Sequence, residues 1–60
     1  MCLATVYKES DHTVLMRNAA GIDVDGEDVI IRDILGDETR IRGRILMVDL
    51  ANSEVKLACD

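Results

Sequence analysis

Residues 29–50 read VIIRDILGDETRIRGRILMVDL, and the fold prediction rests mainly on this stretch. It contains two apolar, β-branched runs joined by residues 35–38, which have turn chemistry. Gly36 tolerates a positive φ, and Asp37 can hydrogen-bond its own backbone. The composition of the runs predicts two adjacent antiparallel strands, at residues 29–34 and 39–50.

The second run alternates cleanly in its first half. Its arginines point to one face and the residues between them to the other, with Arg40, Arg42 and Arg44 against Ile41, Gly43, Ile45 and Met47. From Ile45 onward the sequence Ile-Leu-Met-Val is apolar on both faces, which predicts a place covered on both sides. A long strand with such a change is typical of one that bends across a small barrel, and Gly43 is the expected bend.

The other segments read as short strands and turns. Strands are expected at residues 1–7, 13–16, 22–24 and 54–59, with residues 18–21 forming a loop or one helical turn. Asp25-Gly26 suits a tight type I′ hairpin, and Val55, Leu57 and Cys59 should face inward. No window keeps a helical period. The prediction is an all-β fold, a small antiparallel β-barrel or roll of five to six or more short strands, SH3-like or Sm-like in size, in a single domain at residues 1–60.

The size and composition of the chain predict a homodimer. A chain of 60 residues buries only about 60% of its unfolded surface. Tyr7 is the only aromatic residue, yet 48% of the chain is apolar. Strands this short cannot hide that much apolar surface within one copy, so a second copy is expected to cover it.

Net charge and targeting signals limit which partners and which cellular location the sequence predicts. The net charge is −5, which argues against general nucleic-acid binding through phosphate neutralisation. The sequence has neither a signal peptide nor a long apolar run, which predicts a cytoplasmic protein with reduced thiols and no membrane association.

Cys2 is the residue with the most suggestive chemistry. A thiolate is a soft ligand that suits nickel, copper(I) or zinc. If Met1 is removed, Cys2 offers a thiolate and an α-amine on one residue; if Met1 is retained, the backbone amide nitrogen of Cys2 can bind once deprotonated. Two chains meeting at a two-fold axis would supply two thiolates and two nitrogens, a set whose planar geometry favours Ni(II) or Cu(II). The plain alternative is a small buried apolar side chain.

The sequence also resembles a known family. The Met-Cys opening, the turn Asp33-Ile34-Leu35-Gly36-Asp37 and the run from Gly43-Arg44-Ile45 to Val48-Asp49-Leu50 look like the CooT family. These are small nickel-binding accessory proteins associated with carbon monoxide dehydrogenase maturation, and the resemblance covers nearly the whole chain. It implies a metallochaperone that binds Ni(II) through Cys2, as a homodimeric β-barrel sharing one metal between its subunits, with a nickel enzyme such as carbon monoxide dehydrogenase as partner.

Three weaker candidates remain. His12 lies in a polar turn and is either a solvated surface residue or a secondary metal ligand. Cys59 could lie beside Cys2 if the first and last strands pair, or it could be an inert buried thiol. The face made by Arg40, Arg42 and Arg44 could meet RNA phosphates, which is the alternative function, or could pair with acids across the sheet. Some relatives are described as predicted RNA-binding proteins.

An enzyme is not expected. The sequence offers no set of nucleophile, base and orienting residue, no paired histidines and no phosphate-binding loop. The function classes that remain are a nickel-binding accessory protein, a small RNA-binding barrel and a purely structural interaction module.

Overall fold

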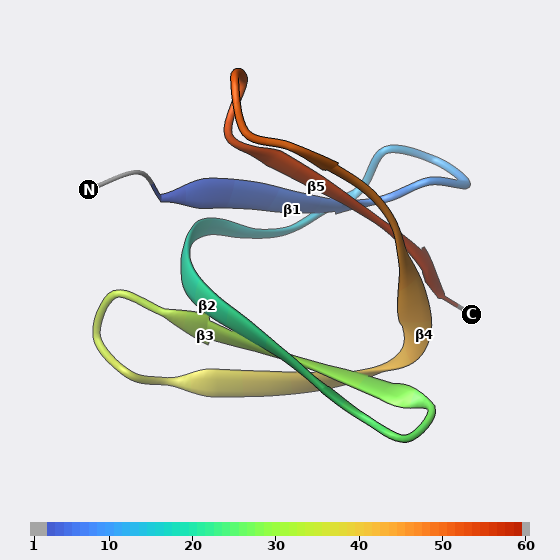
Figure 1. Cartoon of the computed structure of the whole chain (residues 1–60), viewed down its shortest axis with the longest axis horizontal. Helices are drawn as coiled ribbons and strands as arrows, with labels where there is room; N and C mark the ends of the chain where they lie inside the picture. The colour runs from blue at the N-terminus through green and yellow to red at the C-terminus, as the bar shows by residue number, and fades with distance from the viewer. Residues whose placement is uncertain (1–2, 60) are drawn as a thin grey trace.

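Five strands form a closed barrel in the computed structural model, which describes residues 3–59 (Figure 1). The strands are β1 (Ala4–Lys8), β2 (Val14–Asp25), β3 (Asp28–Asp33), β4 (Glu38–Asp49) and β5 (Glu54–Cys59). Neighbours in sequence pair antiparallel, whereas β1 and β5 close the barrel in parallel. The predicted all-β barrel is confirmed, with a parallel closing pair that local sequence patterns do not reveal.

The β4 strand bends at Gly43 and serves both halves of the barrel. It pairs with β3 as far as Arg42 and with β5 from Gly43 onward. A Cβ at residue 43 would collide with the carbonyl oxygen of Ala58 and lie 2.9 Å from the Cβ of Cys59. Only glycine permits this close approach of two backbones, so the predicted bend is confirmed. Figure 1 shows β4 curving from β3 toward its hairpin with β5.

The β2 strand is continuous, which corrects the prediction of a loop or helical turn at residues 18–21. This segment is where β2 changes partner, since Ala19 faces Ala4 of β1 and also Asp33 of β3. A register shift lies between Ala19 and Gly21. Pairing with strands on both sides therefore overrides the weak strand propensity of these residues.

The β2–β3 hairpin has a different turn from the one predicted. Asp25 pairs with Asp28, so the central residues are Gly26 and Glu27 rather than Asp25 and Gly26. Gly26 has a φ of 61°, and Glu27 is not among the described residues with positive φ. A positive φ at the first central residue alone is the pattern of a type II′ turn.

The core is small and comes from four of the strands. Among residues 3–59 the buried apolar side chains are Val6, Ala19, Val29, Ile31, Val55 and Leu57. Ile41 and Ile45 of β4 pack against this cluster, as the alternation predicts. Val55 and Leu57 face inward as expected, whereas Cys59 is only half-buried.

The second half of β4 is not covered on both sides within one chain, contrary to the prediction. A register shift falls between Ile45, which pairs with Leu57, and Met47, which pairs with Lys56. From this shift onward every second side chain is open to solvent, whereas Met47 is half-buried. The exposed fractions are 41% for Leu46, 53% for Val48 and 83% for Leu50.

Candidate functional site

The start of β1 is the described segment closest in sequence to Cys2, which itself lies outside the described residues. Ala4 faces Ala19 of β2, and the Thr5 amide donates to the Ser53 carbonyl at 2.8 Å. Ser53 belongs to the turn between β4 and β5. The beginning of β1 is therefore anchored between β2 and the β4–β5 hairpin, at one end of the barrel.

The β4–β5 turn beside this anchor is held by a side-chain cap. The Asp49 carboxylate accepts hydrogen bonds from the Asn52 side-chain amide at 2.8 Å and from the Asn52 backbone amide at 3.1 Å. The Asn52 side-chain bond is the main reason why the pKa of Asp49 is lowered. A carboxylate stabilised in this way fixes the turn that contacts β1.

Exposed apolar side chains project from this end of the barrel on both sides of the start of β1. On one side is the β4 arm, which we define as Leu46, Val48 and Leu50. On the other is the β3–β4 turn with Ile34 and Leu35, which follows directly after Asp33, the β3 partner of Ala19. The order around this rim is thus β4 arm, β5, β1, β2 and β3–β4 turn. A single copy leaves these side chains in water, although burial would stabilise them.

Cys59 lies at the opposite end of β1. The first and last strands do pair, but in parallel, with Thr5 facing Glu54 and Lys8 facing Leu57. Cys59 is therefore beyond the end of β1, past the backbone bond from the Glu9 amide to the Leu57 carbonyl. The expected pairing of the first and last strands is therefore present, but it does not bring Cys59 to the start of β1 within one chain. No group of three metal-ligating side chains occurs among residues 3–59.

His12 lies at the end of the β1–β2 turn, against Tyr7. Its φ is 61°, its amide donates to the Lys8 carbonyl at 2.9 Å, and its ring centroid lies 5.8 Å from that of Tyr7 with a 60° tilt. In the same turn the Thr13 amide donates to the Asp11 carboxylate at 3.0 Å, and hydrogen bonding by the Thr13 side chain and amide lowers the pKa of that carboxyl. The imidazole thus packs on an aromatic ring, beside the end of β1 rather than its start.

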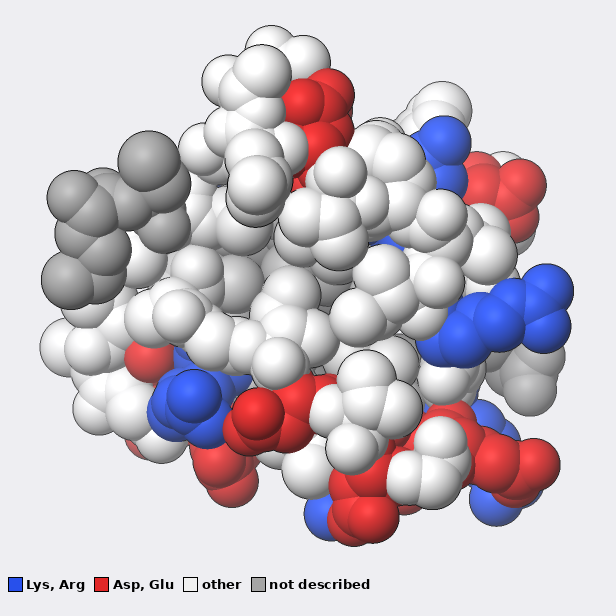
Figure 2. All heavy atoms as spheres, in the orientation of Figure 1, with Lys and Arg blue, Asp and Glu red and all other residues white. Residues whose placement is uncertain are grey.

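The first two arginines of the predicted stripe are paired with acids. Arg40 contacts Asp28 at 2.8 Å and Asp25 at 3.3 Å, and Arg42 contacts Glu27 at 3.4 Å. The bond to Asp28 is the main cause of a raised pKa at Arg40. Figure 2 shows acidic and basic side chains gathered together along the lower edge of the molecule, while the middle of this face is uncharged.

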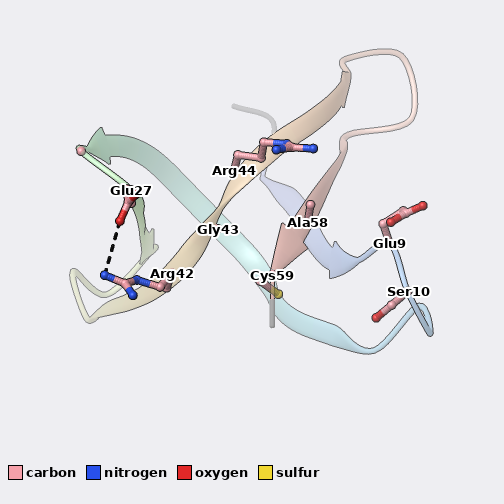
Figure 3. A pocket seen from close by; sticks show the side chains of 9 residues that line it. Glu9, Ser10, Glu27, Arg42, Gly43, Arg44, Ala58 and Cys59 are labelled. Atoms are coloured by element: carbon pink, nitrogen blue, oxygen red, sulfur yellow. Dashed lines mark ion pairs between the residues drawn. The ribbon is translucent and has the colours of Figure 1, made fainter.

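Arg44 is separated from the other two by the bend. An open hollow of about 620 Å³ lies between the Gly43 bend, the end of β5 and two hairpin turns. In Figure 3 Arg42 reaches toward Glu27 on one side of Gly43, and Arg44 extends away on the other. The stripe is therefore divided in space, and paired acids neutralise its first half. Cys59 also lines this hollow.

Sequence reasoning missed the β3–β4 turn and the β4 arm as surface features. The signal was present in both cases. Ile34 and Leu35 are bulky aliphatic residues inside a segment whose other residues are Asp and Gly, and turns ordinarily favour small or polar residues. The sequence of the arm is apolar on both faces of β4, which predicts that both faces are covered. This pattern does not distinguish cover by the same chain from cover by a second copy.

Comparison with known proteins identifies the family. The sequence model of the family described as CO dehydrogenase accessory protein CooT matches residues 1–58, a range that includes Cys2. Neither a curated protein nor a solved structure matches the chain. Nowhere in residues 3–59 is there a helix with the length and hydropathy needed to cross a membrane. Since the match spans nearly the whole chain, this protein belongs to the CooT family of CO dehydrogenase accessory proteins.

Proposed function

We propose that this accessory protein carries Ni(II) as cargo for carbon monoxide dehydrogenase, bound by the Cys2 thiolates of two copies. The observation that carries the proposal is the family match over residues 1–58, which includes the cysteine at position 2. Membership itself gives a role in supporting CO dehydrogenase. The metal, its ligands and the dimer are the further steps of the proposal.

The ligand chemistry of Cys2 supports nickel over zinc. Thiolate sulfur and amine or amide nitrogen on one residue favour a planar donor set, which Ni(II) accepts and tetrahedral Zn(II) does not. One copy supplies a single thiolate, which is too few ligands for tight binding. Two copies related by a two-fold axis supply two thiolates and two nitrogens, a full set.

The rim at the start of β1 supports assembly around this site. A stable dimer buries about 800 Å² on each partner, roughly one fifth of the 4070 Å² surface of the described chain. The β4 arm places exposed leucine and valine side chains beside the turn that holds Thr5. A second copy seated on the arm would cover the face of β4 that its own barrel leaves open, with the two N-terminal segments close to the axis.

A carrier role also fits the chemistry better than catalysis. Protons compete with the metal for thiolate and nitrogen donors, so the ion can be released as well as bound. We propose that the chain is not itself an enzyme and that it acts in the cytoplasm, where thiols stay reduced.

Titration of the purified protein with Ni(II) tests the proposal. The native chain should bind one ion per two copies and develop a thiolate-to-nickel charge-transfer band that weakens as the pH falls below neutrality. Cys2→Ser should abolish the band and the tight binding. Cys59→Ser is the matched control and should leave both intact, because Cys59 lies past the far end of β1.

Two results would contradict the proposal. One is a Cys2→Ser protein that binds nickel as tightly as the native chain. The other is loss of the band in Cys59→Ser, which would place the thiolate ligand at the other end of the barrel.

A further inference from the structure

The β3–β4 turn has an unusually well-fixed backbone for an exposed loop. The Asp33 carboxylate oxygen Oδ1 accepts hydrogen bonds from the Leu35 amide at 2.8 Å and the Asp37 amide at 3.1 Å. The Asp33 amide donates to the Asp37 carbonyl at 2.9 Å, and the Gly36 amide donates to the Asp33 carbonyl at 3.0 Å. Gly36 adopts the φ of 94° that this closure requires. The turn is therefore pre-organised.

This fixed backbone presents two aliphatic side chains to solvent. The exposed fraction is 57% for Ile34 and 84% for Leu35. Neither belongs to the buried core or to the residues packed against it. A rigid turn that holds bulky apolar groups in water has the properties of an anchor for a protein surface, since little conformational entropy is lost on binding.

Acidic residues lie on both sides of the two apolar residues along the chain. Asp33 and Asp37 flank them in sequence, followed by Glu38. Glu38 lies 3.6 Å from Arg32, whereas Asp37 has no ion pair among the described residues. The turn therefore presents an apolar tip flanked by negative charge. A partner surface that matches it would have an apolar socket bordered by lysine or arginine.

A second copy of this chain fits that description poorly. Each copy carries a net charge of −5. Arg32, Arg40 and Arg42, which account for three of its seven basic residues, are already paired with acids of the same chain. The charges thus favour a different protein as the occupant.

We propose that the β3–β4 turn docks, through Leu35 and Ile34, into a basic-edged apolar socket on the nickel-receiving dehydrogenase. This rests on the proposed function for the identity of the partner. The turn lies on the same rim as the start of β1, so docking would hold the end of the barrel where β1 begins, two residues after Cys2 in the sequence, against the recipient. The roles of the side chains differ: Leu35 anchors the complex, and Asp37 speeds its formation by long-range attraction.

Surface plasmon resonance with immobilised native protein and purified nickel-free carbon monoxide dehydrogenase tests this docking. Leu35→Ser should weaken binding by about tenfold or more, mainly through faster dissociation. Asp37→Asn should slow association at low salt and flatten the salt dependence of the association rate. Val24→Ser removes an exposed apolar side chain beside the β2–β3 hairpin and should bind like the native chain.

Light scattering and circular dichroism on the same variants complete the test. Leu35→Ser should keep the native fold and assembly state, because its side chain lies outside the core and away from the β4 arm. The inference is overturned if the native chain does not bind the dehydrogenase, if Leu35→Ser binds it undiminished, or if Leu35→Ser dissociates the dimer. The nickel proposal fails by a different result. If Cys2→Ser still binds nickel and still docks like the native chain, the nickel proposal is wrong and the docking proposal stands.

Discussion

At the scale of the residue, short polar contacts decide which groups are fixed and which are available. The carboxylates of Asp49 and Asp33 accept hydrogen bonds from turn amides. The guanidinium of Arg40 donates hydrogen bonds to Asp28 and Asp25. These groups hold the hairpins together and are not offered to a ligand. The exposed side chains without such partners include the apolar groups of the β4 arm and the β3–β4 turn.

The cap between Asp49 and Asn52 predicts a pH dependence of stability. Because hydrogen bonds lower the pKa of Asp49 in the folded chain, its carboxylate stabilises the fold above the unfolded-state pKa, about 3.9. That contribution is lost as the pH falls through the lower folded-state pKa. Asp49→Asn should therefore melt at a lower temperature than the native chain at neutral pH.

Thermal melts of both proteins from pH 7 to pH 2 check this. The difference in melting temperature should shrink once the pH is below about 4. The similarly capped Asp11 is present in both proteins, so its titration cancels in the comparison. A difference that stays constant down to pH 2 would show that the Asp49 carboxylate does not stabilise the turn.

At the scale of the element, β4 is the strand on which the barrel depends. Its partner changes at Gly43, where the Gly43 amide also donates to the Glu27 carbonyl at 3.0 Å. The bend thus ties together β3, β5 and the β2–β3 turn. A side chain at this position has no room to form, since a backbone carbonyl occupies its place.

Gly43→Ala should destabilise the protein by about 1–3 kcal/mol, because the backbones of β4 and β5 must separate to admit a methyl group. A chain of 60 residues has a total stability of about 3–9 kcal/mol, so the loss should be plain in urea denaturation. Arg44→Ala, at the neighbouring exposed position, should change stability by less than about 0.5 kcal/mol. Equal midpoints for Gly43→Ala and the native chain would refute the close approach.

Local alternation was sufficient to predict part of the fold. The β3–β4 pairing, the Gly43 bend and the inward faces of Val55 and Leu57 all follow from period-two patterns and turn chemistry within one stretch. The parallel closure of β1 on β5 joins segments from opposite ends of the chain and leaves no local signal. The continuity of β2 through residues 18–21 depends on partners on both sides, which outweigh local propensity.

The candidate site was predictable to a different degree. Cys2 could be identified from its chemistry and from the family resemblance, without any knowledge of the fold. The position of Cys59 could not be predicted from the sequence, because it depends on the direction in which β5 runs beside β1. The arginine stripe was read correctly as alternating, but its acidic partners come from β2 and β3 and from the turn between them, and only the fold brings these together.

At the scale of the whole molecule, one end of the barrel differs from the other. The end where β1 begins carries the β4 arm and the β3–β4 turn, both apolar and exposed. The other end has the β1–β2 turn, the β2–β3 turn and Cys59 around an open hollow lined by charged side chains. The proposed self-assembly and the proposed docking both use the end where β1 begins.

The β4 arm predicts how the proposed dimer can be broken. Replacing Val48 and Leu50 together by serine should raise the dimer dissociation constant by about tenfold or more, since both side chains would otherwise be buried against the second copy. Each is more than half exposed in one copy, so the barrel should stay folded. Sedimentation equilibrium across the micromolar range checks this, with Val24→Ser as control. Unchanged association in the double variant would place the interface elsewhere.

Native mass spectrometry of the nickel-loaded protein shows whether two copies share one metal ion through Cys2. We expect a species of two chains and one nickel ion, and a Cys2→Ser protein that remains a dimer without metal. Nickel on single chains, or nickel retained by the Cys2→Ser dimer, would contradict it.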